Sequence, residues 1–197
     1  MQASVRDRLR NLAVRIDDAI QSSGRKSDDL ALIAVSKTKP ASMIMEALAA
    51  GHSLFGENYA QELVAKSDEL KGEDLCFDFI GSLQTNKVKQ VVGRARMIHS
   101  VDRLKLLQTI DRQAGLLGIR QDILLEVNVG EDESKSGCTI DEALPLAESA
   151  LDLSNVMLRF LFTIPPFLLH PHQTRPYFFS LSLLLLTIFE LFLSVIE

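Results

Sequence analysis

The sequence predicts an α/β fold built around a parallel sheet. Short runs rich in β-branched and apolar residues alternate with longer segments whose apolar residues recur at helical spacing. The segments between successive runs are long enough for the crossover helix that parallel pairing requires. Repeated strand-helix units form either a barrel or a doubly wound sheet, and the pattern alone does not choose between them.

The first predicted element is a helix. It ends at Gly24, and because no strand precedes it, we expect it to lie across the outside of the fold. Its helical spacing comes from five apolar residues: Val5, Leu9, Leu12, Ile16 and Ile20.

Strands and helices then alternate along the chain. The predicted strands cover residues 31–37, 53–57, 75–81, 97–101, 123–129 and 156–164. The helices between them cover residues 42–50, 59–70, 87–92, 104–114 and 139–151. Thr139 and Glu142 stand at the capping-box spacing, which marks the start of the last of these helices.

Lys37 is the first candidate for chemistry. It ends the first strand and, counting by twos, shares a face with Val35 and Ile33. Its amine would emerge at the carboxyl end of the sheet, where strand-helix repeat folds carry their sites. If the amine is desolvated there, its pKa falls, and a neutral amine can attack an aldehyde to give a Schiff base. From these residues alone, a lysine that simply reaches into water is the alternative.

Composition and charge exclude several classes of function. The net charge of -5 and the scattered basic residues argue against a nucleic-acid surface. Cys76 and Cys138 lie far apart, so neither a zinc site nor a disulfide framework is predicted. Residues 1–20 are charged throughout and do not form a signal peptide, which favours a cytoplasmic protein. At 197 residues the chain is short for a closed barrel, which typically takes about 250 residues.

Six short motifs stand in the order found in a known family. They are VSKTKP at 35–40, FGENY at 55–59 followed by Gln61 and Glu62, FIGSLQTNK at 79–87, HSVDR at 99–103, KSG at 135–137 and TIPP at 163–166. From about residue 30 to residue 166 the sequence resembles the pyridoxal phosphate homeostasis proteins, the YggS/PROSC family.

This resemblance implies a (β/α)8 TIM-barrel-like fold of the alanine racemase N-terminal domain type, lacking its last two strands. It implies that pyridoxal 5'-phosphate binds as a Schiff base on Lys37, the lysine of the Val-Ser-Lys motif. No catalysed reaction is established for the family as a whole. The implied role is a carrier or regulator of the free cofactor pool, with pyridoxal phosphate-dependent apo-enzymes as partners and without nucleic acid.

Polar residues near the ends of several predicted strands complete the candidate cofactor site. They are Asn58, Ser82, His99 and Thr163. Each has another explanation, because Asn58 and Ser82 are suited to capping the helices that follow them, and His99 is suited to a hydrogen-bonded place in the core. Lys39 is the rival imine-forming lysine, but it lies in the loop beyond the strand, where hydration favours its protonated form. No metal site is predicted, because His170 and His172 lack carboxylate support.

The chain changes character after about residue 160. Of its 21 basic and 26 acidic residues, only Arg175, Glu190 and Glu197 lie in 160–197, a segment that holds seven of the ten phenylalanines. The family pattern Arg-Gly-Leu-Met is replaced here by RFLF at 159–162, and the family's last two strand ends, which bind the phosphate, have no counterpart. We therefore predict a partial barrel domain over residues 1–176 and an atypical apolar segment over 177–197.

Three interpretations of residues 177–196 compete. Their length and hydropathy suit a membrane anchor, although Glu190 argues against it. An amphipathic helix would place Leu181, Leu185, Ile188 and Phe192 inward and Leu183, Leu184 and Leu191 outward. An altered end that replaces the last two barrel strands explains the loss of motifs and the change of composition together, and is slightly favoured.

Two other functions remain open at this stage. An enzyme of the alanine racemase type needs a second acid/base group, usually a tyrosine from another domain, and only Tyr59 and Tyr177 exist in the chain. A remnant that does not bind the cofactor, with a tail that associates with a membrane or a partner, is the third possibility.

Overall fold

The computed structural model describes residues 4–132, 134–168 and 170–196. Six strands form one parallel sheet in the order β1-β2-β3-β4-β5-β6. Because each strand lies beside the next one in the chain, the order is that of a barrel, whereas a doubly wound sheet reverses its order at a switch point. The predicted barrel-like α/β fold is confirmed.

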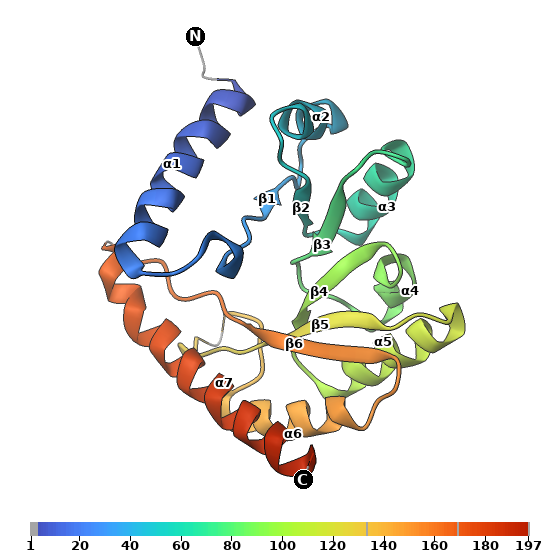
Figure 1. Cartoon of the computed structure of the whole chain (residues 1–197). Helices are drawn as coiled ribbons and strands as arrows, with labels where there is room; N and C mark the ends of the chain where they lie inside the picture. The colour runs from blue at the N-terminus through green and yellow to red at the C-terminus, as the bar shows by residue number, and fades with distance from the viewer. Residues whose placement is uncertain (1–3, 133, 169, 197) are drawn as a thin grey trace.

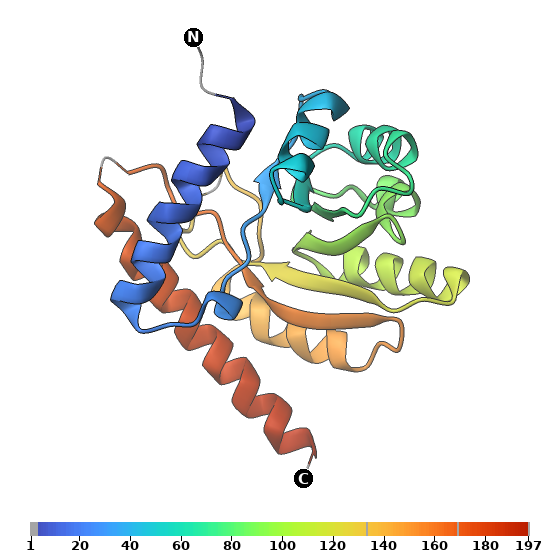
Figure 2. The ribbon, with the colours of Figure 1, turned by 45° about the horizontal axis from the view of Figure 1, so that its top comes forward.

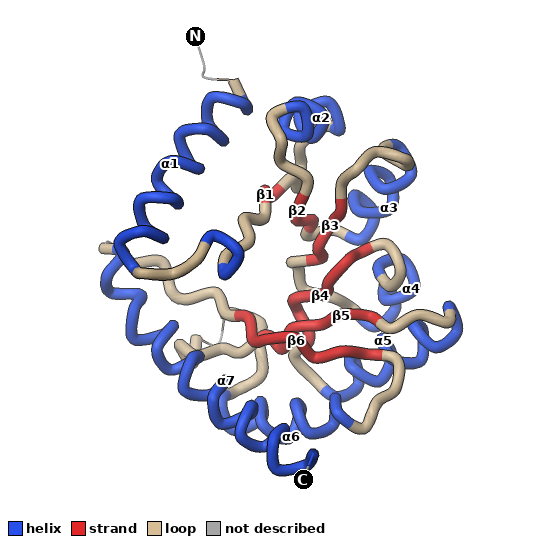
Figure 3. Tube along the Cα trace, viewed as in Figure 1, coloured by secondary structure: helices blue, strands red, loops and turns tan. Residues whose placement is uncertain are grey.

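The strands curve around a concave side, and helices α2 to α6 lie on the outer side (Figure 1, Figure 3). The strands are β1 Ala34–Val35, β2 Leu54–Glu57, β3 Cys76–Phe79, β4 Ala95–Val101, β5 Gln121–Glu126 and β6 Val156–Phe162. The outer helices are α2 Ala41–Ala49, α3 Ala60–Glu69, α4 Val88–Val91, α5 Leu104–Leu117 and α6 Ile140–Leu151. Short 3-10 turns, η1 to η3, cover Ser27–Asp29, Thr85–Lys87 and Pro171–Thr174.

The core lies between the sheet and these outer helices. Alternate strand residues point toward the helices and are almost fully buried, as Phe79, Ile98 and Ile123 show. The residues between them, such as Asp78 in β3 and Asp122 in β5, face the concave side. Most strand residues on the helix side are therefore apolar, Glu57 of β2 being an exception, whereas the concave side carries several charges.

Helix α1 Val5–Ser23 lies at the edge of the fold beside α2, and the Val5 amide donates to Oε1 of Glu46 at 2.9 Å (Figure 2). It begins at Ser4, whose side chain accepts a hydrogen bond from the Asp7 amide, and it ends at Gly24 in the left-handed conformation. None of its residues is fully buried, although Val5 and Leu9 pack against the core. The predicted helix and its place outside the fold are confirmed.

The predicted first strand, 31–37, is too long. Only Ala34 and Val35 pair with β2, opposite Phe55 and Gly56. β1 is at the edge of the sheet, and beyond Val35 the ladder ends with the Ser36 amide, which donates to the carbonyl oxygen of Gly56 at 3.0 Å. The predicted helix at 87–92 is also different, because its start is the 3-10 turn η2.

Strands β1 and β6 are the two ends of the sheet and do not pair with each other, so the described residues form an open barrel. Helix α7 Arg175–Ile196 follows β6 and lies against α6 (Figure 1).

The amphipathic interpretation of α7 is correct for Ile188, which is buried, and for Leu183, which is exposed. It is wrong for Leu184, which is buried. The partly buried residues Tyr177 and Leu181 and the buried residues Leu184 and Ile188 follow one another at intervals of three or four residues, so they share one face of the helix. The side chains of Leu191 and Phe192 lie outside the described part of the structure. Within the described residues, no helix has both the length and the apolar character needed to cross a bilayer.

Candidate functional site

The candidate site begins with Lys37, which follows β1 at its carboxyl end. Val35 faces the concave side with 51% of its surface exposed, and Lys37, two residues further along, is exposed as well. The desolvation considered for this amine is therefore not observed. The reason is structural: within the described residues β1 is an edge strand with a neighbour on one side only, so one flank of Lys37 is left uncovered.

Asn58 and Ser82 come together in one pocket beside the ends of β2 and β3. The pocket has a volume of about 380 Å³, and Tyr59, Gln84 and Lys87 also line it. The side-chain oxygen Oδ1 of Asn58 is buried there without a hydrogen-bond partner. A buried amide oxygen without a partner costs free energy, so this atom marks a place where a donor from a ligand would be stabilised.

The expectation that Asn58 and Ser82 cap the helices that follow them is wrong. Helix α3 has Tyr59 at its N-cap and η2 has Gln84, and neither turn is capped by a side chain. Gly81 explains how the two strand ends approach each other, because a Cβ atom at this position would lie 2.1 Å from the carbonyl oxygen of Asn58. Only glycine allows this contact.

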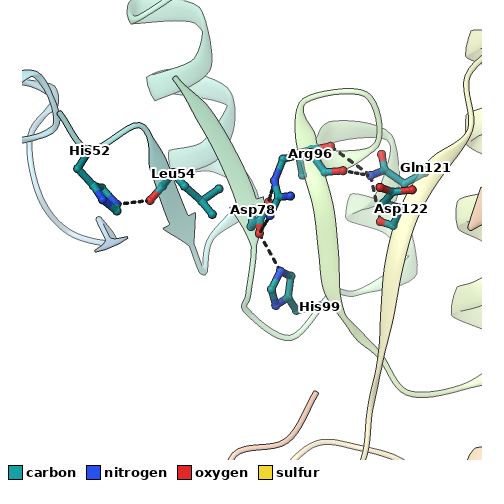
Figure 4. A network of polar contacts seen from close by, with 8 residues as sticks. His52, Leu54, Asp78, Arg96, His99, Gln121 and Asp122 are labelled. Atoms are coloured by element: carbon teal, nitrogen blue, oxygen red, sulfur yellow. Dashed lines mark hydrogen bonds and ion pairs between the residues drawn. The ribbon is translucent and has the colours of Figure 1, made fainter. Parts of the chain in front are cut away.

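His99 lies within β4 and belongs to a buried ionic network (Figure 4). Its Nε2 is 2.9 Å from Oδ2 of Asp78, which is fully buried. Arg96 donates from Nε and Nη2 to the two oxygens of the same carboxylate, at 2.9 and 2.7 Å. The His99 ring meets Phe162 of β6 edge to face, with 5.6 Å between ring centroids. The observed contacts are those of a core histidine with its hydrogen bond satisfied, and contact with a cofactor stays a prediction.

Thr163 follows β6, and its hydroxyl donates to the carbonyl oxygen of Val127 at 2.7 Å. The hydroxyl therefore ties the end of β6 to the end of β5. Lys135 reaches the same region, where its amine donates to the carbonyl oxygens of Ile164 and Pro165 at 3.1 and 2.8 Å. These contacts hold the KSG and TIPP motifs next to each other.

Glu126 is a further acidic group at this end of the sheet. It lies in β5 opposite Phe162 and is 6% exposed. Burial, with a smaller contribution from the Asp102 carboxylate, raises the pKa of Glu126 to about 7. Near neutral pH this carboxyl group therefore exchanges a proton with its surroundings.

Sequence reasoning missed Glu126 and the pairing of Asp78 with Arg96. The available signal was a charged residue inside a predicted apolar strand, which both Asp78 and Glu126 provide. Among the described residues, no group of three or more histidine, cysteine or carboxylate side chains could hold a metal ion. The rings of His170 and His172 stack on each other.

Comparison with known proteins identifies similar chains. The family model of alanine racemase, N-terminal domain, matches residues 10–181. A pyridoxal phosphate homeostasis protein of Aquifex aeolicus is 42% identical over 87% of this chain and 75% of that protein. Another from Pseudomonas aeruginosa is also 42% identical, over 83% of this chain and 71% of that protein.

Solved structures agree with these matches. PipY of Synechococcus elongatus, solved with pyridoxal phosphate bound, has a TM-score of 0.81 and 32% identity, and the match covers 94% of this chain and 82% of that chain. An alanine racemase of Clostridium difficile shares the fold at 14% identity, with a TM-score of 0.67 over 90% of this chain and 47% of that chain.

Proposed function

This chain belongs to the pyridoxal phosphate homeostasis protein family, and on that premise we propose that it binds pyridoxal 5'-phosphate as a Schiff base on Lys37. The protein then holds the cofactor for the cell's free pool without catalysing a reaction. The observation that carries this proposal is the Lys37 side chain, which is exposed on the open concave side at the carboxyl end of β1.

The residues present fit the aldehyde end of the cofactor. When bound, pyridoxal phosphate supplies an aldehyde that an amine can attack, and the Lys37 amine is accessible for this step. Asn58 follows β2, the strand that pairs with β1, and its amide oxygen lacks a donor. We assign Asn58, Ser82, His99 and Thr163 to the surroundings of the cofactor, with Asn58 supported best by its geometry.

The proposal also covers the organisation of the chain, its location and its partners. Residues 1–176 are assigned to the cofactor-binding unit, and 177–197 to an added apolar segment that associates with a membrane or a partner. Cytoplasmic localisation and transfer of the cofactor to apo-enzymes agree with the family, and the two free thiols, Cys76 and Cys138, suit a reducing compartment.

The proposal is tested by the absorbance spectrum of the purified chain with added pyridoxal phosphate. The chain and its Lys39→Ala variant should develop the imine band, and Lys37→Ala should not. Turnover of alanine or another amino acid by the loaded protein would contradict the non-catalytic role. Absence of the imine band from the unmodified chain would contradict cofactor binding on a lysine.

A further inference from the structure

A buried ionic cluster lies on the helix side of the sheet, beneath the strand end that carries Lys37. Lys66 of α3 is 7% exposed, and its amine donates to three oxygen atoms. These are the backbone carbonyl of Ser36 at 2.7 Å, Oε1 of Glu57 at 2.6 Å and Oε2 of Glu62 at 2.8 Å. An ammonium group has three donors, so every donor of Lys66 is used.

The same cluster holds the residues on both sides of Lys37. The hydroxyl of Ser36 donates to Oε1 of Glu57 at 2.6 Å, and the amide of Thr38 donates to Oε2 of Glu62 at 2.7 Å. Lys37 stands between these two anchored residues, and its own side chain is exposed on the opposite, concave side. The cluster therefore fixes the backbone of 36–38 from below.

Thr38 indicates that this backbone is held in an unfavourable conformation. Its φ is 61°, in the left-handed region, which β-branched residues rarely adopt. Such a conformation is unfavourable and persists only where surrounding contacts determine it. The hydrogen bond from the Thr38 amide to Glu62 is one contact of this kind.

The cluster also keeps Lys66 from competing with Lys37 for an aldehyde. Burial by itself would lower the pKa of Lys66, but the hydrogen bonds and charges of Glu57 and Glu62 outweigh it, so the pKa of Lys66 is raised. A protonated amine has no lone pair with which to attack a carbonyl carbon.

Stability alone does not account for the cluster. A buried ion pair is often no more stabilising than apolar side chains of similar volume, because both charges lose their hydration. Glu57 is fully buried, and its Oε2 has no hydrogen-bond partner, which adds to this cost.

We propose that Lys66, Glu57 and Glu62 are positioning residues that set the 36–38 turn so that the Lys37 amine faces the cofactor aldehyde. This inference rests on the proposed function of Lys37 and adds the residues that orient it. The reacting bond is the imine between the Lys37 nitrogen and the cofactor carbon, formed with loss of one water, and none of the three positioning residues takes part in it.

The test uses the full chain and the double variant Glu57→Gln/Lys66→Met, which removes both charges while keeping similar side-chain volumes. Lys71→Met is the matched control, because Lys71 is an exposed lysine just after α3. Thermal unfolding establishes that each protein is folded, and the rate of imine formation with pyridoxal phosphate is measured together with the labelled lysine after borohydride reduction.

We expect the double variant to form the imine at Lys37 about tenfold more slowly, because small misplacements of a reacting group have large effects on rate. Part of the label should move to Lys39, whereas Lys71→Met should behave as the unmodified chain. A folded double variant that labels Lys37 at the unmodified rate would overturn the inference.

A second variant covers the case in which the double variant does not fold. Glu62→Gln changes a side chain that is 30% exposed and keeps an oxygen for the Thr38 amide. We expect a slowing of about threefold, and an unchanged rate at Lys37 would again overturn the inference. If the unmodified chain forms no imine at all, the proposed function itself fails, so the two failures are distinguishable.

Discussion

The region of β1 to β4 and the region of β6 with α7 are stabilised in different ways. In the first, buried carboxylates are paired with cations: Glu57 with the buried Lys66, and Asp78 with Arg96, whose side chain is 42% exposed. In the second, large apolar side chains are exposed: Phe160 by 60% and Phe167 by 98%.

This difference indicates which region must hold its side chains and backbone in fixed positions. Burying charges costs hydration, so a site that keeps them gains something other than stability. Here the cluster of Glu57 and Lys66 bonds to Ser36, next to Lys37. The second region depends on apolar contacts that tolerate changes of shape more easily. The comparison can be tested by changing matched residues in the two regions.

The largest effect is expected at Asp78. Asp78→Ala removes a fully buried carboxylate that is hydrogen-bonded to Arg96 twice and to His99 once. Because the Arg96 side chain is 42% exposed and can be hydrated, the free energy of unfolding should fall by about 3 to 4 kcal/mol, mainly through the lost charge-assisted hydrogen bonds. The matched change Asp122→Ala removes the pair with Arg159, whose side chains are 27% and 47% exposed, and should cost less than about 1 kcal/mol. Urea unfolding of both variants measures the difference, and equal losses would remove the contrast between the two regions.

A smaller effect is expected in α7. Ile188 is 2% exposed, so Ile188→Ala should lower the free energy of unfolding by about 2 to 3 kcal/mol through loss of buried contacts. Leu186→Ala, two residues before it and 61% exposed, should change stability by less than about 0.5 kcal/mol. If both variants are as stable as the unmodified chain, α7 does not pack on the barrel in solution.

Glu126, at the boundary of the two regions, gives a prediction that depends on pH. Its pKa is raised to about 7 in the folded state, so between its ordinary value and 7 the folded protein binds more protons than the unfolded chain. Stability should therefore fall as pH rises through this window. Glu126→Gln removes this titration. Between pH 5 and pH 8 the free energy of unfolding of the variant should therefore rise by about 2 kcal/mol relative to that of the unmodified chain. Parallel stability curves for the two proteins would show that Glu126 keeps an ordinary pKa.

Much of the fold could be predicted from periodicity, because the order of strands and helices depends on local apolar spacing. The length of β1 could not, since it depends on pairing with β2, which is a contact between distant parts of the chain. Leu184 was placed wrongly because a helix that is apolar on most sides gives no clear buried face.

The candidate site was predictable where a charge interrupts an apolar pattern. Lys37 stands out for this reason, at the end of a strand. Lys66 does not, because a lysine in a helix of mixed charge resembles a solvated residue. Its burial depends on how α3 packs against the sheet, which no local pattern reveals.

The most direct test of the account is the identity of the lysine that binds the cofactor. The complex with pyridoxal phosphate is reduced with borohydride, digested, and its labelled peptide sequenced by mass spectrometry. The account predicts one pyridoxyl group on Lys37 of the unmodified chain. A label on Lys39 or Lys66 with Lys37 unmodified would contradict it.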